Sequence, residues 1–471
     1  MNPTPLTVAI AGGGLAGLAA ACALADSGLR VTLFERRPYL GGRASSYEHP
    51  GTGEVVDNCQ HVLFRVCTNL VEFYQRIGVD HQIRWYDEMT FIEPGGRTSV
   101  MHASPLPAPL HTSPSFLRFP FLDWKDKLLI SRAIAALSLR EQPDTGRSFQ
   151  DWCDQHGQTE NAIQRFWKPI LVSALSEDLD LISISYAAQV VRESMKSPEA
   201  RHMGVPAIPL TDLYNQAGDY IRARHGEIHF RSSLETFSSE PSQVQIRIAD
   251  KEQGSRESAF DYLVLALPFN NVSSVLPASP DAAPLRENLT HFESCPITGI
   301  HLWFDRQITN LDHAVLLDRT IQWMFHKSRL LTTRGANAES GGSYIELVVS
   351  ASKSLIDKSR AEIVDLALKE GCEFFPAARE ATLVKSTVIK EVHATYSPRP
   401  GIDAHRPPQS TPWPRIFLAG DWTATGWPAT MEGAVRSGYL AAEALLRAAG
   451  VDSPRFLSAD LPAAGLMRFF S

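Results

Sequence analysis

The sequence predicts an α/β fold in which a doubly wound, Rossmann-type nucleotide-binding domain is interleaved with an α+β substrate domain. Two observations carry this prediction. An apolar strand at residues 8–11 runs directly into the glycine-rich string GGGLAG at residues 12–17, and a second strand, ending in Gly420-Asp421, returns near the other end of the chain. With 471 residues, 44% of them hydrophobic, the chain is long enough to form two domains, each with its own core.

The first fifty residues contain the parts of a dinucleotide site in order. Gly12 permits a tight turn, Gly14 lets the backbone approach a pyrophosphate, and Gly17 lets the following alanine-rich helix pack close to the strand. The next strand, residues 31–34, ends at Glu35, about 20 residues beyond the glycines, where an acidic side chain accepts a ribose hydroxyl. Because an acidic residue disfavours a 2′-phosphate, NADP is not expected at this site.

A second glycine motif, the string LGGRA at residues 40–44, follows Glu35. Two glycines before Arg43 suit a loop that closes over the pyrophosphate, where the guanidinium neutralises phosphate charge. Residues 12–44 resemble the opening of the FAD-dependent amine oxidase and phytoene desaturase superfamily, which the double-glycine–arginine extension marks. The resemblance implies FAD as the cofactor, and a nucleotide domain of the glutathione-reductase and amine-oxidase type.

Residues 416–421 predict a strand that is followed by a helix beginning near Met431. Gly420 permits close backbone approach, Asp421 can accept hydroxyl groups of a ribityl chain, and the positive helix end points toward reduced-flavin charge. The alternative is a purely structural βα unit in which Asp421 caps the helix. The stretch resembles the C-terminal FAD signature of phytoene and ζ-carotene desaturases. It contains no cysteine, so we expect non-covalent FAD.

The resemblance implies a cofactor site assembled from both ends of the chain and from the segments between them. The residues expected to contact FAD are Gly12, Gly14, Leu15, Ala16, Gly17, Glu35, Arg36, Gly42, Arg43, Asn58, Gln60, His61, Leu234, Ala266, Gly420, Asp421, Thr430, Met431 and Glu432.

Changes in composition along the chain predict where the two domains alternate. We expect the FAD-binding domain to comprise residues 1–82, 205–285 and 400–450, the substrate domain residues 83–204 and 286–399, and a C-terminal tail residues 451–471. Hydrophobic periodicity predicts helices at residues 124–139, 212–225 and 357–374 and strands at residues 227–230, 244–248 and 262–268.

A polar string, DNCQH at residues 57–61, interrupts an otherwise apolar segment. Polar side chains in such a place are costly unless they are hydrogen-bonded. Either the string is a hydrogen-bonded loop, or Gln60 and His61 lie near the flavin with Asp57 as an orienting partner. The string resembles the squalene-associated FAD-dependent desaturases, now understood as hydroxysqualene dehydroxylases, and residues 165–175 resemble a segment of that family that faces the substrate.

The family resemblance implies a reaction that removes the hydroxyl of hydroxysqualene reductively and gives squalene, a hopanoid and sterol precursor. The protein must then protonate the departing oxygen. His61 is the first candidate for the group near that oxygen, with Asp57 fixing it and Gln60 bonding to the flavin or the hydroxyl. Three alternatives remain: a phytoene-type isoprenoid desaturase, an amine oxidase with Trp422 and Trp427 as its aromatic pair, and a non-catalytic prenyl-lipid binding protein.

Composition excludes some partners. A net charge of −7 argues against nucleic acid, and six cysteines without CxxC spacing indicate a reduced, cytoplasmic chain without a metal site. No Lys or Arg precedes the uncharged run at residues 8–25, so we do not expect a signal peptide.

The segments at residues 110–129 and 461–470 are apolar, and we expect them to contact the inner face of a membrane peripherally. That membrane would be the source of a long-chain isoprenoid substrate. The sequence contains no second nucleotide motif, so it does not identify the electron donor. Neighbouring enzymes of the squalene pathway are the expected protein partners.

Overall fold

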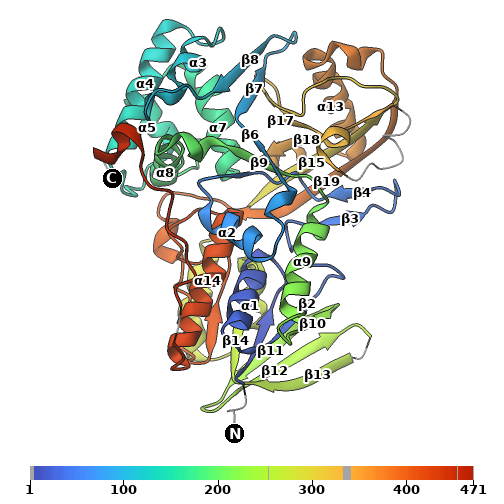
Figure 1. Ribbon diagram of the computed structural model, residues 1–471, viewed down its shortest axis with the longest axis vertical. Coiled ribbons are helices and arrows are strands. Elements are labelled where there is room, and N and C mark those ends of the chain that lie inside the picture. The colour runs from blue at the N-terminus through green and yellow to red at the C-terminus, as the bar shows by residue number, and fades with distance from the viewer. Residues whose placement is uncertain (1–4, 253, 333–340, 453, 470–471) are drawn as a thin grey trace.

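The computed structural model describes residues 5–252, 254–332, 341–452 and 454–469. A parallel sheet lies in the lower half of Figure 1, with strand order β10-β2-β1-β14-β20. Every pairing in it is parallel, which confirms the predicted Rossmann-type α/β fold. Its strands are β1 (Thr7–Ala11), β2 (Arg30–Glu35), β10 (Glu227–Phe230), β14 (Tyr262–Leu265) and β20 (Ile416–Leu418).

Small side chains bring the helices of this half close together. Helix α1 (Leu15–Asp26) is buried along nearly its whole length and packs against α14 (Met431–Ala448). A Cβ added at Gly438 of α14 would lie 2.3 Å from the Ala16 carbonyl oxygen of α1, so the two helices touch through their backbones. Helices from near the beginning and near the end of the sequence therefore pack side by side against the parallel sheet (Figure 1).

A larger sheet forms the upper right part of Figure 1, with strand order β19-β15-β18-β17-β16-β7-β8. One face, with Ile300, Leu302 and Ile345, packs against α13 (Arg360–Phe374). Because side chains alternate along a strand, the opposite face carries the other residues of these strands. The strands are β7 (Glu88–Ile92), β8 (Thr98–His102), β15 (Ser294–Phe304), β16 (His313–Leu316), β17 (Trp323–His326), β18 (Ser343–Ser350) and β19 (Leu383–Tyr396).

A helical group at the upper left of Figure 1 packs against the second face of this sheet. Its aromatic residues, among them Phe119 and Phe166, form one hydrophobic core with Trp323 and Phe325 of β17. The Trp323 indole also donates to the Ser173 hydroxyl at 2.7 Å. The helices are α3 (Ser113–Leu117), α4 (Trp124–Leu139), α5 (Phe149–Gln155), α6 (Glu160–Ala162), α7 (Lys168–Leu175) and α8 (Ile184–Met195).

Smaller elements connect these parts. The short helices are α2 (Thr68–Arg76), α9 (Leu210–Arg222), α10 (Phe269–Val275), α11 (Ala283–Thr290) and α12 (Lys327–Leu330). The remaining strands are β3 (Ser46–Glu48), β4 (Val55–Asp57), β5 (Leu63–Phe64), β6 (Ile83–Tyr86), β9 (Met203–Pro206), β11 (Ser232–Ser239), β12 (Val244–Asp250) and β13 (Gly254–Phe260).

The C-terminal segment ends in a 3₁₀ turn, η10 (Gly465–Phe469), that docks beside the helical group, where the Leu466 amide donates to the Ala108 carbonyl at 2.8 Å. Residues 453, 470 and 471 of the predicted tail lie outside the described residues. Among the helices that the structure describes, none has the length and apolar character needed to cross a bilayer.

Candidate active site

The loop after β1 has room for a ligand only because it is built from glycine. Gly12 has φ +112°, and a Cβ there would lie 2.4 Å from the Ala266 carbonyl oxygen. A Cβ at Gly17 would lie 1.9 Å from the Gly12 carbonyl oxygen. Gly14 occupies the N-cap position of α1 and no side chain caps this helix, so the first-turn N–H groups are left for an anion. This arrangement fits a pyrophosphate.

The second glycine motif lies directly on the first. The Gly41 amide donates to the Gly13 carbonyl at 2.9 Å, and a Cβ at Gly42 would lie 2.9 Å from the Gly14 Cα. Glu35 is buried beside the same loop, with its carboxylate accepting from the amides of Gly13 at 2.7 Å and of Arg37 at 2.8 Å. The acidic residue predicted to bind a ribose therefore lies beside the glycine loop predicted to bind the pyrophosphate. Arg36 is exposed beside it.

Arg43 connects this region to the far end of the chain. Its guanidinium donates to the Asp421 carboxylate at 2.6 Å and to the Ala394 carbonyl at 2.9 Å. Burial opposes the charge of Arg43, but Asp421 outweighs that effect and raises the arginine pKa. Gly420, next to Asp421, donates its amide to the Ser437 hydroxyl of α14. Residues from both ends of the sequence thus meet at one site.

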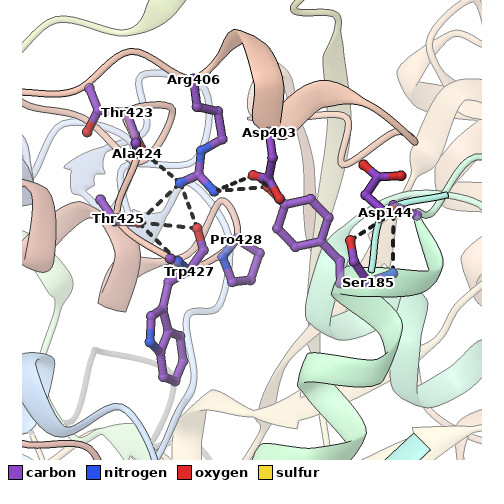
Figure 2. A network of polar contacts seen from close by, with 12 residues as sticks. Asp144, Ser185, Asp403, Arg406, Thr423, Ala424, Thr425, Trp427 and Pro428 are labelled. Atoms are coloured by element: carbon purple, nitrogen blue, oxygen red, sulfur yellow. Dashed lines mark hydrogen bonds and ion pairs between the residues drawn. The ribbon is translucent and has the colours of Figure 1, made fainter. Parts of the chain in front are cut away.

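A residue that sequence reasoning missed, Arg406, holds the loop after Asp421 in shape (Figure 2). Its buried guanidinium donates to the carbonyls of Thr423 at 2.6 Å, Trp427 at 2.7 Å and Asp421 at 3.1 Å. These three carbonyls accept from Nη2. The second terminal nitrogen of the guanidinium, Nη1, donates to the Tyr186 hydroxyl and the Asp403 carboxylate. One side chain thereby fixes residues 421–427 to helix α8.

The three predicted cofactor residues at the start of α14 have different contacts. Thr430 caps the helix by accepting from the Gly433 amide at 3.1 Å, and Met431 sulfur accepts from the Tyr214 hydroxyl. The buried carboxylate of Glu432 instead accepts from the Leu70 amide at 2.7 Å and pairs with Arg436. The Glu432 side chain is therefore engaged at the N-terminus of α2, and a contact of this residue with the cofactor stays a prediction.

The remaining predicted contacts lie around the glycine loop. Leu15 and Ala16 are buried in the first turn of α1, and the Ala266 amide donates to the Ala11 carbonyl at the end of β1. Leu234 is buried in β11, opposite Ile248.

The polar string at residues 57–61 begins at the end of β4 and meets a buried lysine. The Lys327 ammonium donates to the Asp57 carboxylate at 2.6 Å and to the Gln60 side-chain oxygen at 2.7 Å. Burial disfavours the charge of Asp57, yet Lys327 with the Ser46 hydroxyl and Leu210 amide holds its pKa below the ordinary value. Burial also disfavours the charge of Lys327, but Asp57 and Glu346 outweigh burial and raise the Lys327 pKa.

Asn58 links this string to the phosphate end. Its amide nitrogen donates to the Arg43 carbonyl, and its backbone amide donates to the Ser45 carbonyl at 2.9 Å. On the other side, a Cβ at Gly299 of β15 would lie 3.2 Å from the Asn58 carbonyl oxygen. The string is therefore clamped between the glycine loops and the larger sheet.

His61 is arranged differently from the prediction. Its Nδ1 lies 2.8 Å from the Cys59 carbonyl, so this nitrogen carries the proton and Nε2 is an acceptor. Burial lowers the His61 pKa, so the ring is neutral at pH 7. Asp57 bonds to Lys327, Ser46 and Leu210 instead. The expectation that Asp57 fixes His61 is wrong, because the buried lysine is the stronger partner for that carboxylate.

Glu346 of β18 completes the cluster. It is fully buried, and its carboxylate lies 3.4 Å from the Lys327 ammonium. Across the sheet it faces His301 of β15, whose Nδ1 contacts the Tyr344 hydroxyl at 2.8 Å. Within the residues that the structure describes, no three His, Cys, Asp or Glu side chains are placed to hold a metal ion.

The comparisons with known proteins agree with this architecture. Residues 15–446 match the family model described as "Flavin containing amine oxidoreductase". The chain belongs to this family. A member of the flavin-containing amine oxidoreductase family carries a flavin, and FAD is the cofactor, as predicted. The protein is accordingly an FAD-dependent oxidoreductase.

Two similar curated relatives from Synechococcus elongatus are a probable zeta-carotene desaturase and a 15-cis-phytoene desaturase. Each is 28% identical to this chain; the alignments cover 95% and 94% of this chain and 100% and 96% of the relatives.

Among solved structures of this family's fold, putrescine oxidase bound to putrescine has a TM-score of 0.69 at 17% identity, covering 95% of this chain and 99% of that one. Cyclohexylamine oxidase from Brevibacterium oxydans has a TM-score of 0.67 at 17% identity, covering 95% and 100%. At this identity the likeness shows the fold alone.

The amine oxidase alternative predicted that Trp422 and Trp427 form an aromatic pair. The Trp422 indole donates to the Leu267 carbonyl at 2.9 Å, while Trp427 lies beneath the Arg436 guanidinium. The ring contacts of the described residues include no contact between these two tryptophans. They do not form the predicted pair.

Proposed function

We propose that this flavoenzyme acts on a long-chain isoprenoid and that it removes the hydroxyl of hydroxysqualene to give squalene. The relatives named as phytoene and zeta-carotene desaturases, which align along nearly the whole chain, support an isoprenoid substrate. The DNCQH string supports the finer assignment through its resemblance to hydroxysqualene dehydroxylases.

One observation carries the choice of an alcohol over a hydrocarbon. The buried cluster of Lys327, Asp57 and Glu346 adjoins the aromatic face of the larger sheet, where Trp323 and Phe325 lie. An aromatic face suits a polyisoprenoid chain. A hydrocarbon has no group for the cluster to bind, whereas an alcohol has a hydroxyl that can be hydrogen-bonded and protonated.

When bound in its reduced form, FAD supplies a hydride. The residues of this chain have the other tasks. The aromatic core around Phe119 and Phe166 excludes water from a carbon that loses its hydroxyl, and the charged cluster orients the oxygen. His61, neutral and with an acceptor Nε2, can receive a hydrogen bond from the hydroxyl but has no proton to donate at that atom.

The test is an anaerobic incubation of dithionite-reduced holoenzyme with hydroxysqualene and, separately, with phytoene, followed by lipid extraction. We expect squalene from hydroxysqualene and no change in phytoene. The second candidate, a phytoene-type desaturase, is favoured by the names of the relatives. It predicts the opposite result: phytoene is desaturated by oxidised enzyme with an electron acceptor, and hydroxysqualene is not consumed.

We also propose that the enzyme takes its substrate from a membrane on which it docks peripherally. Large apolar side chains are exposed around α3, α4 and η10, two of them strongly: Trp124 at 74% and Phe469 at 81%. The Leu466–Ala108 hydrogen bond connects η10 to the loop that precedes α3. The exposed cations Arg118, Lys125 and Arg468 lie among them and suit anionic headgroups.

Vesicle flotation tests this membrane contact. Because burying one large apolar side chain is worth about 2 kcal/mol, we expect Trp124→Ser with Phe469→Ser to weaken binding to anionic vesicles by at least about tenfold. Val384→Ser is the matched control, since Val384 is 55% exposed but lies on β19. Equal flotation of all three proteins would rule the surface out.

A further inference from the structure

Glu346 is a buried acid that forms a long ion pair with Lys327 at 3.4 Å. Within the described part of the chain, neither of its carboxylate oxygens has a partner in hydrogen-bond geometry. Its nearest cation, Lys327 at 3.4 Å, already donates to Asp57 and Gln60 at shorter distances. A buried carboxyl without a hydrogen-bond partner costs stability, and in a native structure such a group calls for an explanation.

We propose that Glu346 is the proton donor to the hydroxyl oxygen that leaves the substrate, and that Lys327 is a positioning residue that holds Glu346 and residues 57–60 together. This inference rests on the proposed function, in which the substrate is an allylic alcohol of a long-chain isoprenoid.

The position of Glu346 supports this role. On β18 it lies in register with His301 of β15 and with Phe325 of β17. Phe325 belongs to the aromatic core shared with the helical group, and His301 lies on the side of the Asn58–Cys59 backbone. The carboxyl group therefore lies on the boundary between an apolar surface suited to the isoprenoid and the polar string at residues 57–61, which adjoins the glycine loops.

Among the titratable groups of the Lys327 cluster, Glu346 is the one that changes charge near neutral pH. Burial raises the Glu346 pKa to about 7 even though Lys327 opposes the shift. Asp57 stays ionised and Lys327 stays protonated. The remaining neighbours stay neutral: burial lowers the His301 pKa to about 3 and raises the pKa values of Cys59 and Tyr344.

The step is balanced as follows. The Glu346 proton passes to the hydroxyl oxygen, the carbon–oxygen bond breaks with its electron pair on oxygen, and water leaves. The allylic carbon, now cationic, gains a carbon–hydrogen bond from a hydride of the reduced flavin, so the carbon is reduced and the flavin is oxidised by two electrons. The carboxylate that remains lies beside Lys327 and is reprotonated from water.

Glu346→Gln tests this assignment because the amide has the size of the protonated acid and cannot donate a proton in this way. In dithionite-reduced holoenzyme mixed with hydroxysqualene, flavin reoxidation is followed by absorbance. Since general acid catalysis contributes roughly 10²–10⁴-fold, we expect at least about a hundredfold slower reoxidation with unchanged FAD content. Glu346→Asp should restore part of the rate. Glu380→Gln, at an exposed glutamate, is the matched control.

A second readout does not depend on turnover. Infrared difference spectra of the holoenzyme should show a protonated carboxyl band that titrates near neutral pH, shifts in heavy water and is absent in Glu346→Gln. Lys327→Met should move that titration to higher pH, because the neighbouring cation favours the carboxylate. A role in packing alone would leave the titration where it is.

The outcomes separate the two proposals. If wild-type enzyme converts hydroxysqualene and Glu346→Gln does so at the same rate, the assignment of Glu346 falls and the proposed function stands. If wild-type enzyme leaves hydroxysqualene untouched, both fall. A wild-type spectrum without the titrating carboxyl band overturns Glu346 as the donor whatever the enzyme converts, including the case in which Glu346→Gln does not fold.

Discussion

At the phosphate end of the cofactor site, residues 12–17 and 41–42 keep their shape through backbone-to-backbone contacts that leave no space for a Cβ. Around Lys327, by contrast, the contacts are between charged side chains from β4, β18 and the start of α12. The phosphate end is thus specified by steric exclusion within a short stretch of sequence. The Lys327 cluster is specified by charge balance among residues far apart in the chain.

The difference teaches what each region tolerates. A phosphate site of backbone amides needs no side-chain chemistry but accepts no added atom. A buried charge cluster accepts an isosteric change but not the loss of one charge, because the remaining charge is left without a partner. Substitutions of the two kinds should therefore have opposite consequences in the two regions.

The largest effect is expected from one methyl group at the phosphate end. A Cβ at Gly17 would lie 1.9 Å from the Gly12 carbonyl oxygen, so Gly17→Ala should lower the free energy of unfolding by about 3 kcal/mol or more and abolish FAD retention. Denaturant unfolding and flavin absorbance measure both. Gly371→Ala, in the last turn of α13 with no atom within 4 Å of the added Cβ, should instead gain up to roughly 0.5–1 kcal/mol.

The Lys327 cluster should respond to the loss of charge. Lys327→Met leaves the buried carboxylate of Asp57 without its cation, which should cost roughly 3–5 kcal/mol of unfolding free energy. Arg247→Met removes one member of an exposed pair with Glu257 and should cost less than about 1 kcal/mol. Similar costs for both variants would show that the buried cluster is not held by charge.

The pH dependence of stability should identify Glu346. Its pKa is raised from 4.5 to about 7 in the folded protein, so its stabilising contribution is complete below the unfolded value and is lost as pH rises through 7. Relative to Glu346→Gln, wild-type protein should lose up to roughly 3 kcal/mol over this interval. Asp57 titrates in both proteins and cancels. Parallel stability curves, measured by denaturation across pH, would contradict this.

The smallest effect is expected where charge assists the phosphate end. Arg43→Gln removes the pair with Asp421 and the predicted phosphate contact, and should weaken FAD binding by about tenfold in a flavin fluorescence titration. Arg30→Gln, which removes an exposed pair with Glu227, should leave FAD affinity unchanged. A loss of FAD as complete as that expected for Gly17→Ala would reverse the comparison between sterics and charge.

The same contrast explains what the sequence could predict. The glycine loops, Glu35 and Gly420-Asp421 are recognisable because their spacing along the chain is fixed by the geometry of a strand, a turn and a helix. Helix α4 has the predicted bounds, since Asp123 and Asp126 form a capping box at its start. The glycine loops and the start of α4 are both determined by residues that lie close together in the sequence.

The Lys327 cluster could not be predicted because its members meet only after two sheets are placed against each other. His61 was assigned the leading role since it lies in a recognisable string, while Lys327 and Glu346 lie outside any motif. One signal was available: Glu346 is a single acidic residue within the apolar strand SYIELVVS. A buried strand admits a lone charge only where a partner or a task exists. Its partner, Lys327, is 19 positions away in sequence and could not be named from that strand.

The contact between Arg43 and Asp421 has a consequence for the life of the polypeptide in the cell. Arg43 leaves the ribosome 378 residues before Asp421, the carboxylate with which it pairs at the cofactor cradle. FAD therefore cannot be captured tightly during translation, and each new molecule must pass through an empty state. Flavin supply then sets how long that state persists, and with it how many newly made chains survive proteolysis.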